Sequence, residues 1–264
     1  MKKFFWLVPF LLVMFVSLSL VFSETTGVKK KRPLPDEYGN IVINNYAEKN
    51  KMAPVVFRHW LYRSKYTCRA CHVDIGFAME AGGTKIRCDD IKKGFYCGAC
   101  HNGKVAFALI EKGPSGEEVK NCDRCHSLGK DIKFKYDFYK YTAGFPRERF
   151  GNGIDWEKAE DMGLIKLQDQ IPGVSIKRNP LNIPKDYAVK PKVEGLPTII
   201  FSHKKHDTWM GCEGCHPELF GVKPGSTKYS MEDIFAGKFC GQCHGKVSWP
   251  LIDCQRCHAT PVGS

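Results

Sequence analysis

The chain has 264 residues, among them 25 glycines, 15 prolines and 13 cysteines, and its formal net charge is +12. This length allows one or two ordinary domains, and the cysteine content argues against an ordinary intracellular enzyme. Such a positive charge would suggest nucleic acid as the partner of a cytosolic protein. The leader and the cysteine pattern described next argue against that class as well.

The first segment, residues 1–23, predicts a signal peptide. A short basic start precedes an apolar run from Phe4 to Phe22, and Ser23 offers a cleavage site before Glu24. The run is also long enough to span a membrane, so an uncleaved anchor is the alternative. Pro9 inside the run and the polar exit favour removal. We therefore expect an exported, periplasmic or extracellular protein of bacterial type.

Six copies of the pattern Cys-x-x-Cys-His account for twelve of the 13 cysteines, and we number them motifs 1 to 6 in chain order. Their cysteines are Cys68 and Cys71, Cys97 and Cys100, Cys122 and Cys125, Cys212 and Cys215, Cys240 and Cys243, and Cys254 and Cys257. The histidines that follow are His72, His101, His126, His216, His244 and His258. Two thiols at this spacing can form thioethers with the vinyl groups of one haem, and the adjacent histidine can ligate the iron.

Zinc sites and redox dithiols are the alternative interpretation of these cysteines. Neither requires a histidine directly after every second cysteine, whereas all six copies have one. The pattern therefore predicts six covalently attached haem c groups. Each haem carries two propionates, so the basic surplus of the chain is interpreted as compensation for their charge.

Six haems on so short a chain leave about 40 residues for each, too few to build a conventional core. The porphyrins themselves are then predicted to form the apolar interior. The many glycines and prolines agree with loops that wrap the rings. The predicted fold class is a mainly irregular, haem-cored multihaem cytochrome c with short α-helices.

The motifs form two sets of three with matching preludes. Residues 55–59 correspond to residues 199–203, and each stretch ends in a histidine nine residues before a haem cysteine. Cys88 and Met231 likewise each stand nine residues before the second motif of their set. This is an internal duplication. The predicted segments are the signal peptide 1–23, an N-terminal arm 24–52, a first triheme module 53–130, a linker 131–197 and a second triheme module 198–264.

The linker contains no cysteine or histidine. Its first part, residues 131–141, is aromatic and basic, and residues 154–163 predict one short helix with early acidic residues and a glycine stop. The remainder is interrupted by prolines. We expect the linker to wrap the haems and not to form a third domain.

The pattern Phe-x-His-x-x-His followed by three Cys-x-x-Cys-His motifs resembles the triheme class III cytochromes, the c7-type relatives of cytochrome c3. Residues 201–258 fit this pattern closely, and the first module fits with two departures. The resemblance covers roughly half of the mature chain. It implies two tandem class III-like triheme modules in a small electron carrier with closely packed haems.

The ligand on the far side of each iron separates a carrier from an enzyme, because an open position can bind a substrate. Three histidines lie outside the motifs, and all three fall in the preludes. The resemblance implies that His59 serves motif 1, His203 serves motif 4 and His206 serves motif 5. Met231 is the candidate for motif 6, with packing on a ring as the alternative.

The first module departs from the second at two positions. Tyr62 stands where the second module has His206, and Cys88 stands where it has Met231. Cys88 is a candidate ligand of motif 3, with a spare thiol or an intermolecular disulfide as alternatives. Met79 is a further candidate for either iron. Tyrosine can ligate iron, but packing on a porphyrin is the favoured interpretation, so motif 2 is a candidate for a five-coordinate haem.

The sequence favours an electron carrier and not an enzyme, without catalytic residues. We expect it to transfer electrons in bacterial anaerobic respiration, between a quinol-oxidising membrane complex and an outer acceptor or conduit. One alternative is a small-molecule reductase at an open or thiolate-ligated haem of the first module, with Tyr62 or Lys65 as the acid–base group. Another is a structural subunit of an extracellular conduit or filament. Nucleic acid is not expected as a partner, and a membrane only through an uncleaved leader.

Overall fold

The computed structural model describes residues 32–128, 136–179 and 181–260. The chain divides into two units, 1–33 and 34–264, and every element named below belongs to the second unit. The predicted signal peptide and its alternative, a membrane anchor, lie outside the described residues. Within the described ranges, no helix combines the length and apolar character needed to cross a membrane.

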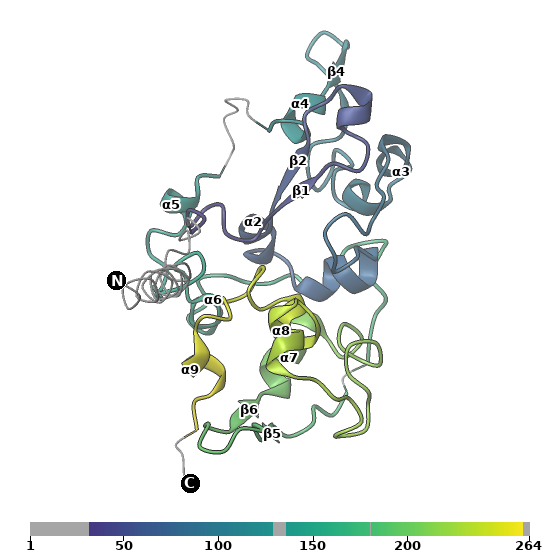
Figure 1. The fold of residues 1–264 in the computed structure, drawn as a ribbon. Coiled ribbons are helices and arrows are strands. Elements are labelled where there is room, and N and C mark those ends of the chain that lie inside the picture. The colour runs from purple at the N-terminus through teal and green to yellow at the C-terminus, as the bar shows by residue number, and fades with distance from the viewer. Residues whose placement is uncertain (1–31, 129–135, 180, 261–264) are drawn as a thin grey trace, which may run out of the picture. The chain divides into compact units, whose positions relative to one another are not determined.

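The first module is built from short helices and two antiparallel hairpins (Figure 1). Strand β1 comes from the N-terminal arm and pairs with β2, so that Asn40 lies opposite Arg58. Its elements are β1 (Asn40–Ile43), η1 (Glu48–Asn50), β2 (Val55–Arg58), α2 (His59–Arg63), η2 (Ala70–Ile75), α3 (Cys88–Lys92), η3 (Tyr96–Ala99), β3 (Ile110–Lys112), β4 (Glu118–Lys120) and α4 (Cys122–Cys125).

The linker and the second module continue in the same style. Strand β5 of the linker pairs antiparallel with β6, with Tyr187 opposite Phe201. The elements are α5 (Phe138–Tyr141), α6 (Trp156–Asp161), β5 (Tyr187–Val189), β6 (Ile199–Phe201), α7 (His203–Met210), α8 (Met231–Phe235), η4 (Phe239–Gln242) and α9 (Cys254–Cys257).

Each module repeats one order of elements: a strand, a helix that begins at a histidine, a second short helix, a 3₁₀ turn on the middle motif and a helix on the last motif. Thus β2, α2, α3, η3 and α4 correspond to β6, α7, α8, η4 and α9. In both cases the segment just before the module supplies the pairing strand. The duplication predicted from the motifs is therefore visible in the backbone.

The middle motif of each module packs so closely on the preceding helix that only glycine fits. A Cβ added at Gly98 would lie 2.0 Å from the carbonyl oxygen of Ile91, and one at Gly241 would lie 2.0 Å from that of Ile234. Real Cβ atoms do not approach a backbone oxygen this closely, so a side chain there would push the motif off its helix. The equivalent distances show that both modules use one local design.

The protein core is small and belongs mostly to the linker. Four of the five residues of the buried cluster, Phe138, Ile154, Trp156 and Ile165, come from the linker, and Trp60 comes from the first module. Trp209 of the second module packs against the same cluster. The linker therefore supplies apolar contacts that join the modules, in addition to any wrapping of the haems.

The predicted helix at residues 154–163 is confirmed as α6. Its N-cap, Asp155, accepts a hydrogen bond from the backbone N–H of Lys158, and Gly163 follows the helix with a positive φ of 69°.

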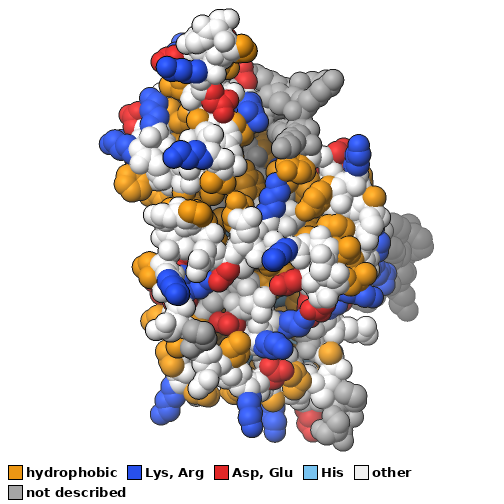
Figure 2. Space-filling model, turned by 180° about the vertical axis from the view of Figure 1, so that it is seen from behind, with side chains coloured by type: hydrophobic (Ala, Val, Ile, Leu, Met, Phe, Trp, Pro, Cys, Tyr) orange, Lys and Arg blue, Asp and Glu red, His pale blue; other side chains and the backbone are white. Residues whose placement is uncertain are grey.

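Outside that cluster the chain buries little apolar surface of its own. The buried hydrophobic residues among the described ranges number twelve, and four of these are alanines. Large apolar side chains such as Phe95 and Phe235 are 60% and 63% exposed. Figure 2 shows hydrophobic side chains over the visible face among scattered lysines and arginines. The predicted fold class, mainly irregular with short helices, is confirmed.

Candidate haem sites

Eight of the nine histidines direct Nδ1 at a backbone carbonyl oxygen, at 2.6–3.1 Å. A carbonyl oxygen only accepts, so Nδ1 donates and Nε2 keeps its lone pair, which is the form that a metal ligand needs. The exception is His244, whose buried Nδ1 makes no hydrogen bond of this geometry, although the backbone of Trp249 lies close enough to raise its pKa. The accepting residues are Gly39 for His59, Phe77 for His72, Phe107 for His101, Ala53 for His126, Lys185 for His203, Ser202 for His206, Phe220 for His216 and Pro197 for His258.

His59, the first residue of α2, faces His72 of motif 1. The two ring centroids are 6.4 Å apart and the ring planes differ by 3°. Two imidazoles that bind one metal ion through Nε2 at about 2.0 Å have ring centres about 6 Å apart. Burial lowers the pKa of His59 to about 4 and lowers that of His72 as well, so both rings are neutral at neutral pH. The pair fits an iron between the two rings.

His206, one turn along α7 from its first residue, faces His244 of motif 5. Their ring centroids are 6.2 Å apart, with the planes at 57°. Burial lowers the pKa of His244 to about 4 and also lowers that of His206. The second module therefore holds a second pair of histidines at a spacing that one iron can bridge.

The structure does not bring the remaining predicted ligands into such pairs. The ring of His203 contacts Phe201 edge-on at 5.0 Å and makes no contact with the ring of His216. Cys88 and Met231 are the exposed first residues of the equivalent helices α3 and α8. Their roles as ligands stay predictions.

One observation links Cys88 to the motif that it was predicted to serve. The pKa of Lys92 is raised by a hydrogen bond to Asp89 and further by the thiols of Cys88 and Cys122. The predicted ligand and the first cysteine of motif 3 therefore lie near the same lysine.

The thiols of the first module form a continuous series. Burial raises the pKa of Cys97 to about 11, with a further contribution from Cys125 of motif 3. Burial raises the pKa of Cys71 to about 12, with contributions from Cys100 and Cys97 of motif 2. Electrostatic interactions of this kind require proximity. Motif 2 therefore neighbours both motif 1 and motif 3.

The series continues into the second module. Burial raises the pKa of Cys243 to about 12, with contributions from Cys68 of motif 1 and Cys215 of motif 4. Burial likewise raises the pKa of Cys240 to about 11, with a contribution from Cys257 of motif 6. Motifs 1, 4 and 5 therefore meet at the junction of the modules, and motif 6 follows motif 5.

The zinc alternative gains no support from this arrangement. A structural zinc site gathers four thiolate or imidazole ligands around one point. Within the described ranges, no group of three or more His, Cys, Asp or Glu side chains is placed to hold a metal ion. The cysteines lie in pairs along the chain of motifs, as thioether attachment requires.

Tyr62 occupies in the first module the place that His206 occupies in the second. Its ring stacks on Phe57 with centroids 4.4 Å apart, and the ring of His206 stacks on Phe201 at 4.2 Å. In each module the prelude histidine meets the same phenylalanine edge-on, at 4.8 Å for His59. The substitution therefore leaves the local frame unchanged.

Sequence reasoning missed Arg63, which lies at the junction of the modules. Its guanidinium lies over the rings of Trp156 and Trp209, 5.1 and 5.2 Å from their centroids. Its Nη1 donates to the carbonyl oxygen of Val247 at 2.8 Å. Burial lowers the pKa of Arg63, and the thiol of Cys68 is the neighbouring group that raises it most. Arginine has no sequence signal for this role, because the two tryptophans come from the linker and the second module.

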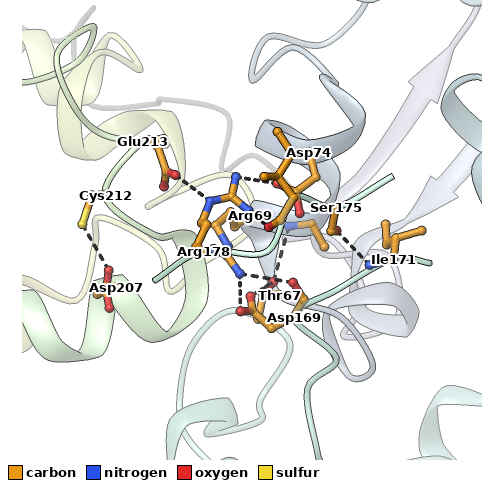
Figure 3. A network of polar contacts seen from close by, with 12 residues as sticks. Thr67, Arg69, Asp74, Asp169, Ile171, Ser175, Arg178, Asp207, Cys212 and Glu213 are labelled. Atoms are coloured by element: carbon orange, nitrogen blue, oxygen red, sulfur yellow. Dashed lines mark hydrogen bonds and ion pairs between the residues drawn. The ribbon is translucent and has the colours of Figure 1, made fainter. Parts of the chain in front are cut away.

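Sequence reasoning also missed Arg178 of the linker, which joins two haem motifs. It donates to Asp74, just after motif 1, and to Glu213, inside motif 4, at 2.6 Å in each case (Figure 3). The side chain of Asp74 is only 1% exposed. Beside this pair Arg69 forms an ion pair with Asp169 of the linker. Arg178 of the linker thus connects a side chain just after motif 1 to a side chain inside motif 4.

Two segments of the chain, residues 55–127 and 199–259, match the model of the family described as cytochrome c7 and related cytochrome c. Together they make up half of the 264 residues. No curated protein matches the chain.

Solved structures give more distant likenesses. A c7-type three-heme cytochrome domain is 38% identical over 28% of this chain and 93% of that domain. The C-terminal hexaheme fragment of GSU1996 is 24% identical over 86% of this chain and 98% of the fragment. Dodecaheme cytochrome c GSU1996 is 22% identical over 83% of this chain and 73% of that protein. The TM-score is 0.26 in each case, too low to compare the three-dimensional arrangements.

Proposed function

This chain belongs to the family of cytochrome c7 and related cytochromes c and binds haem c covalently, and from this premise we propose that it is an exported hexahaem electron carrier. Each Cys-x-x-Cys-His motif would hold one haem. Bound there, haem supplies a one-electron couple at its iron. The part played by the chain is to hold the six sites at fixed spacing, to set the axial ligands and to keep water from the rings.

The observation that carries this proposal is that motifs of the two modules are neighbours, since Arg178 joins Asp74, just after motif 1, to Glu213, inside motif 4, at 2.6 Å in each case. Neighbouring thiols connect motif 3 to motif 2, motif 2 to motif 1, motif 1 to motifs 4 and 5, and motif 5 to motif 6. A carrier with two independent modules would not need Cys68 beside Cys243. The series supports electron passage from one module to the other.

We assign the axial ligands from the same geometry and from the duplication. His59 with His72 would hold the iron of motif 1, and His206 with His244 that of motif 5, as their ring spacing supports. His203 is proposed for motif 4, Met231 for motif 6 and Cys88 for motif 3. These three assignments rest on equivalent positions in the two modules.

The two ends of the series are proposed as the places of electron entry and exit. Cys122 of motif 3 and Cys254 of motif 6 are exposed, as is Cys212 of motif 4. The partners would be redox proteins, namely a quinol-oxidising membrane complex and an outer acceptor or conduit in anaerobic respiration. The proposed location is the periplasm or the extracellular space, supported by the leader and by covalent haem attachment.

The test is the haem count together with electron exchange within one molecule. We expect the mass of the mature holoprotein to correspond to six haems, and a pyridine haemochrome assay to agree. After rapid addition of a substoichiometric reductant, electrons should redistribute over both modules at a rate independent of protein concentration. A concentration-dependent redistribution, or fewer than six haems, would contradict the proposal.

A further inference from the structure

The first module has no histidine to place opposite motif 2. Of the nine histidines, six belong to the motifs, His59 faces His72 and His206 faces His244. His203 lies in the second module, where it donates to Lys185. All nine lie in the described ranges. His101 of motif 2 therefore has no imidazole partner, although its counterpart His244 has one.

Tyr62 takes the place of that partner. The ring of Tyr62 stacks on Phe57 as the ring of His206 stacks on Phe201, at 4.4 and 4.2 Å. The thiols that act on the Tyr62 hydroxyl are, largest first, Cys97 of motif 2, Cys125 of motif 3, Cys71 of motif 1 and Cys100 of motif 2. The equivalent stacking of Tyr62 and His206 assigns the phenol to motif 2, the counterpart of the motif proposed for His206.

The largest electrostatic influences on this hydroxyl are the thiols of Cys97, Cys125, Cys71 and Cys100. Covalent attachment turns these thiols into thioethers, which cannot ionise. Burial also raises the pKa of Tyr62, which keeps the phenol neutral and makes it a hydrogen-bond donor and a poor ligand.

We propose that the haem at motif 2 keeps its distal position open and binds an uncharged diatomic molecule, to which the Tyr62 hydroxyl donates a hydrogen bond. A buried, neutral hydrogen-bond donor favours an uncharged ligand over an anion such as nitrite, since a desolvated anion needs a paired charge. This inference rests on the proposed function only in requiring that motif 2 carries haem.

The duplication supplies a matched experiment with carbon monoxide as the probe. The ferrous holoprotein is titrated with carbon monoxide, and the bound equivalents are counted from the Soret change. Tyr62→His restores the ligand of the second module and should remove one bound equivalent per molecule. His206→Tyr copies the first module into the second and should add one equivalent. The ferric protein should lose one high-spin signal by electron paramagnetic resonance in Tyr62→His and gain one in His206→Tyr.

The role of the hydroxyl is tested by Tyr62→Phe, which keeps the ring on Phe57. This variant should bind the same number of equivalents with about threefold to tenfold weaker affinity at one site, the effect of losing one neutral hydrogen bond. Unchanged affinity would show that the hydroxyl makes no such bond and would overturn that part of the proposal.

Each variant must first show six haems by mass and complete reduction, which separates this inference from the proposed function. If the haem count is six but Tyr62→His binds as much carbon monoxide as the original protein, the open site is not at motif 2 and the inference is wrong. The same conclusion follows if the original protein binds none. Met79→Leu tests a competing ligand. An equivalent that is added by Met79→Leu and removed again when Tyr62→His is combined with it would place Met79 on the iron of motif 2 and contradict an open site there.

Discussion

The two modules share a frame and differ in the residues that face the irons. Phe57 and Phe201 hold their neighbouring rings at nearly equal distances, and Gly98 and Gly241 meet a helix carbonyl at the same 2.0 Å. At one position on that common frame the first module has Tyr62 where the second has a histidine. Packing therefore preserves the frame, and the proposed differences in chemistry between the modules lie in single side chains.

The modules also differ in what surrounds them. The N-terminal arm supplies β1 to the first module, and the linker supplies β5 to the second. The linker adds the buried cluster and the Arg178 bridge between motifs 1 and 4. The modules therefore share one frame and are asymmetric at their junction.

The largest expected effect is the loss of a haem from the shared frame. Gly98→Ala and Gly241→Ala each place a Cβ against a backbone oxygen, at a cost of about 3 kcal/mol. The middle motif should be displaced, and mass spectrometry should find the product one haem short in either variant. Gly144→Ala is the control, because nothing lies within 4 Å of its added Cβ. A full haem count in one variant alone would show that the two frames are not equivalent.

The next effect concerns the junction. Arg178→Ala leaves the carboxylate of Asp74, 1% exposed, without its cation, which should cost about 3 kcal/mol of unfolding free energy. Urea unfolding followed by the Soret band measures the loss. Lys205→Ala removes exposed ion pairs to Glu157 and Asp161 and should cost under about 1 kcal/mol. Equal losses in the two variants would show that Arg178 does not tie the modules together.

Part of this structure could be predicted from the sequence because local chemistry dictates it. The Cys-x-x-Cys-His spacing predicts the haem sites. The repeat predicts the two modules and the correspondence of Tyr62 with His206. The helix α6 follows from its own Asp155 cap and Gly163 stop. These features involve residues close together in the chain.

The rest depends on contacts between distant segments. The hairpins escaped sequence reasoning because β1 and β5 come from outside the motif pattern and are only four and three residues long. Arg63 meets Trp156, Trp209 and Val247, which lie far along the chain, and no local pattern indicates such contacts. The wrapping of the haems by the linker, the module boundaries and the export signal stay predictions.

A smaller effect is expected on the redox potentials of the irons of motifs 3 and 6, the last motif of each module. If Cys88 and Met231 ligate the irons of motifs 3 and 6, their exchange should shift two potentials in opposite directions. Cys88→Met should raise one potential and Met231→Cys should lower another, each by on the order of 100 mV, because a thioether favours the ferrous state more than a thiolate does. Spectroelectrochemical titration of the holoproteins measures both. Unchanged potentials in either variant would remove that residue from the proposed ligands.

The smallest expected effect tests the charge at the junction. Arg63→Met keeps an unbranched side chain between Trp156 and Trp209 but removes a buried positive charge. That charge disfavours the ferric state of nearby irons, so its removal should lower their potentials by about 1 kcal/mol, on the order of 50 mV. Because Arg63 interacts with Cys68 and also with Cys243, the shift should appear in the haems of motifs 1 and 5.

The control for this prediction is Lys223→Met, which removes an exposed charge that water screens, and it should leave all potentials within about 10 mV. A shift confined to one module after Arg63→Met would show that the charge acts inside the first module alone. A shift shared by one haem of each module would mean that a residue of the first module tunes the second. Arg63, at the junction, would then set the redox potential of one haem in each module.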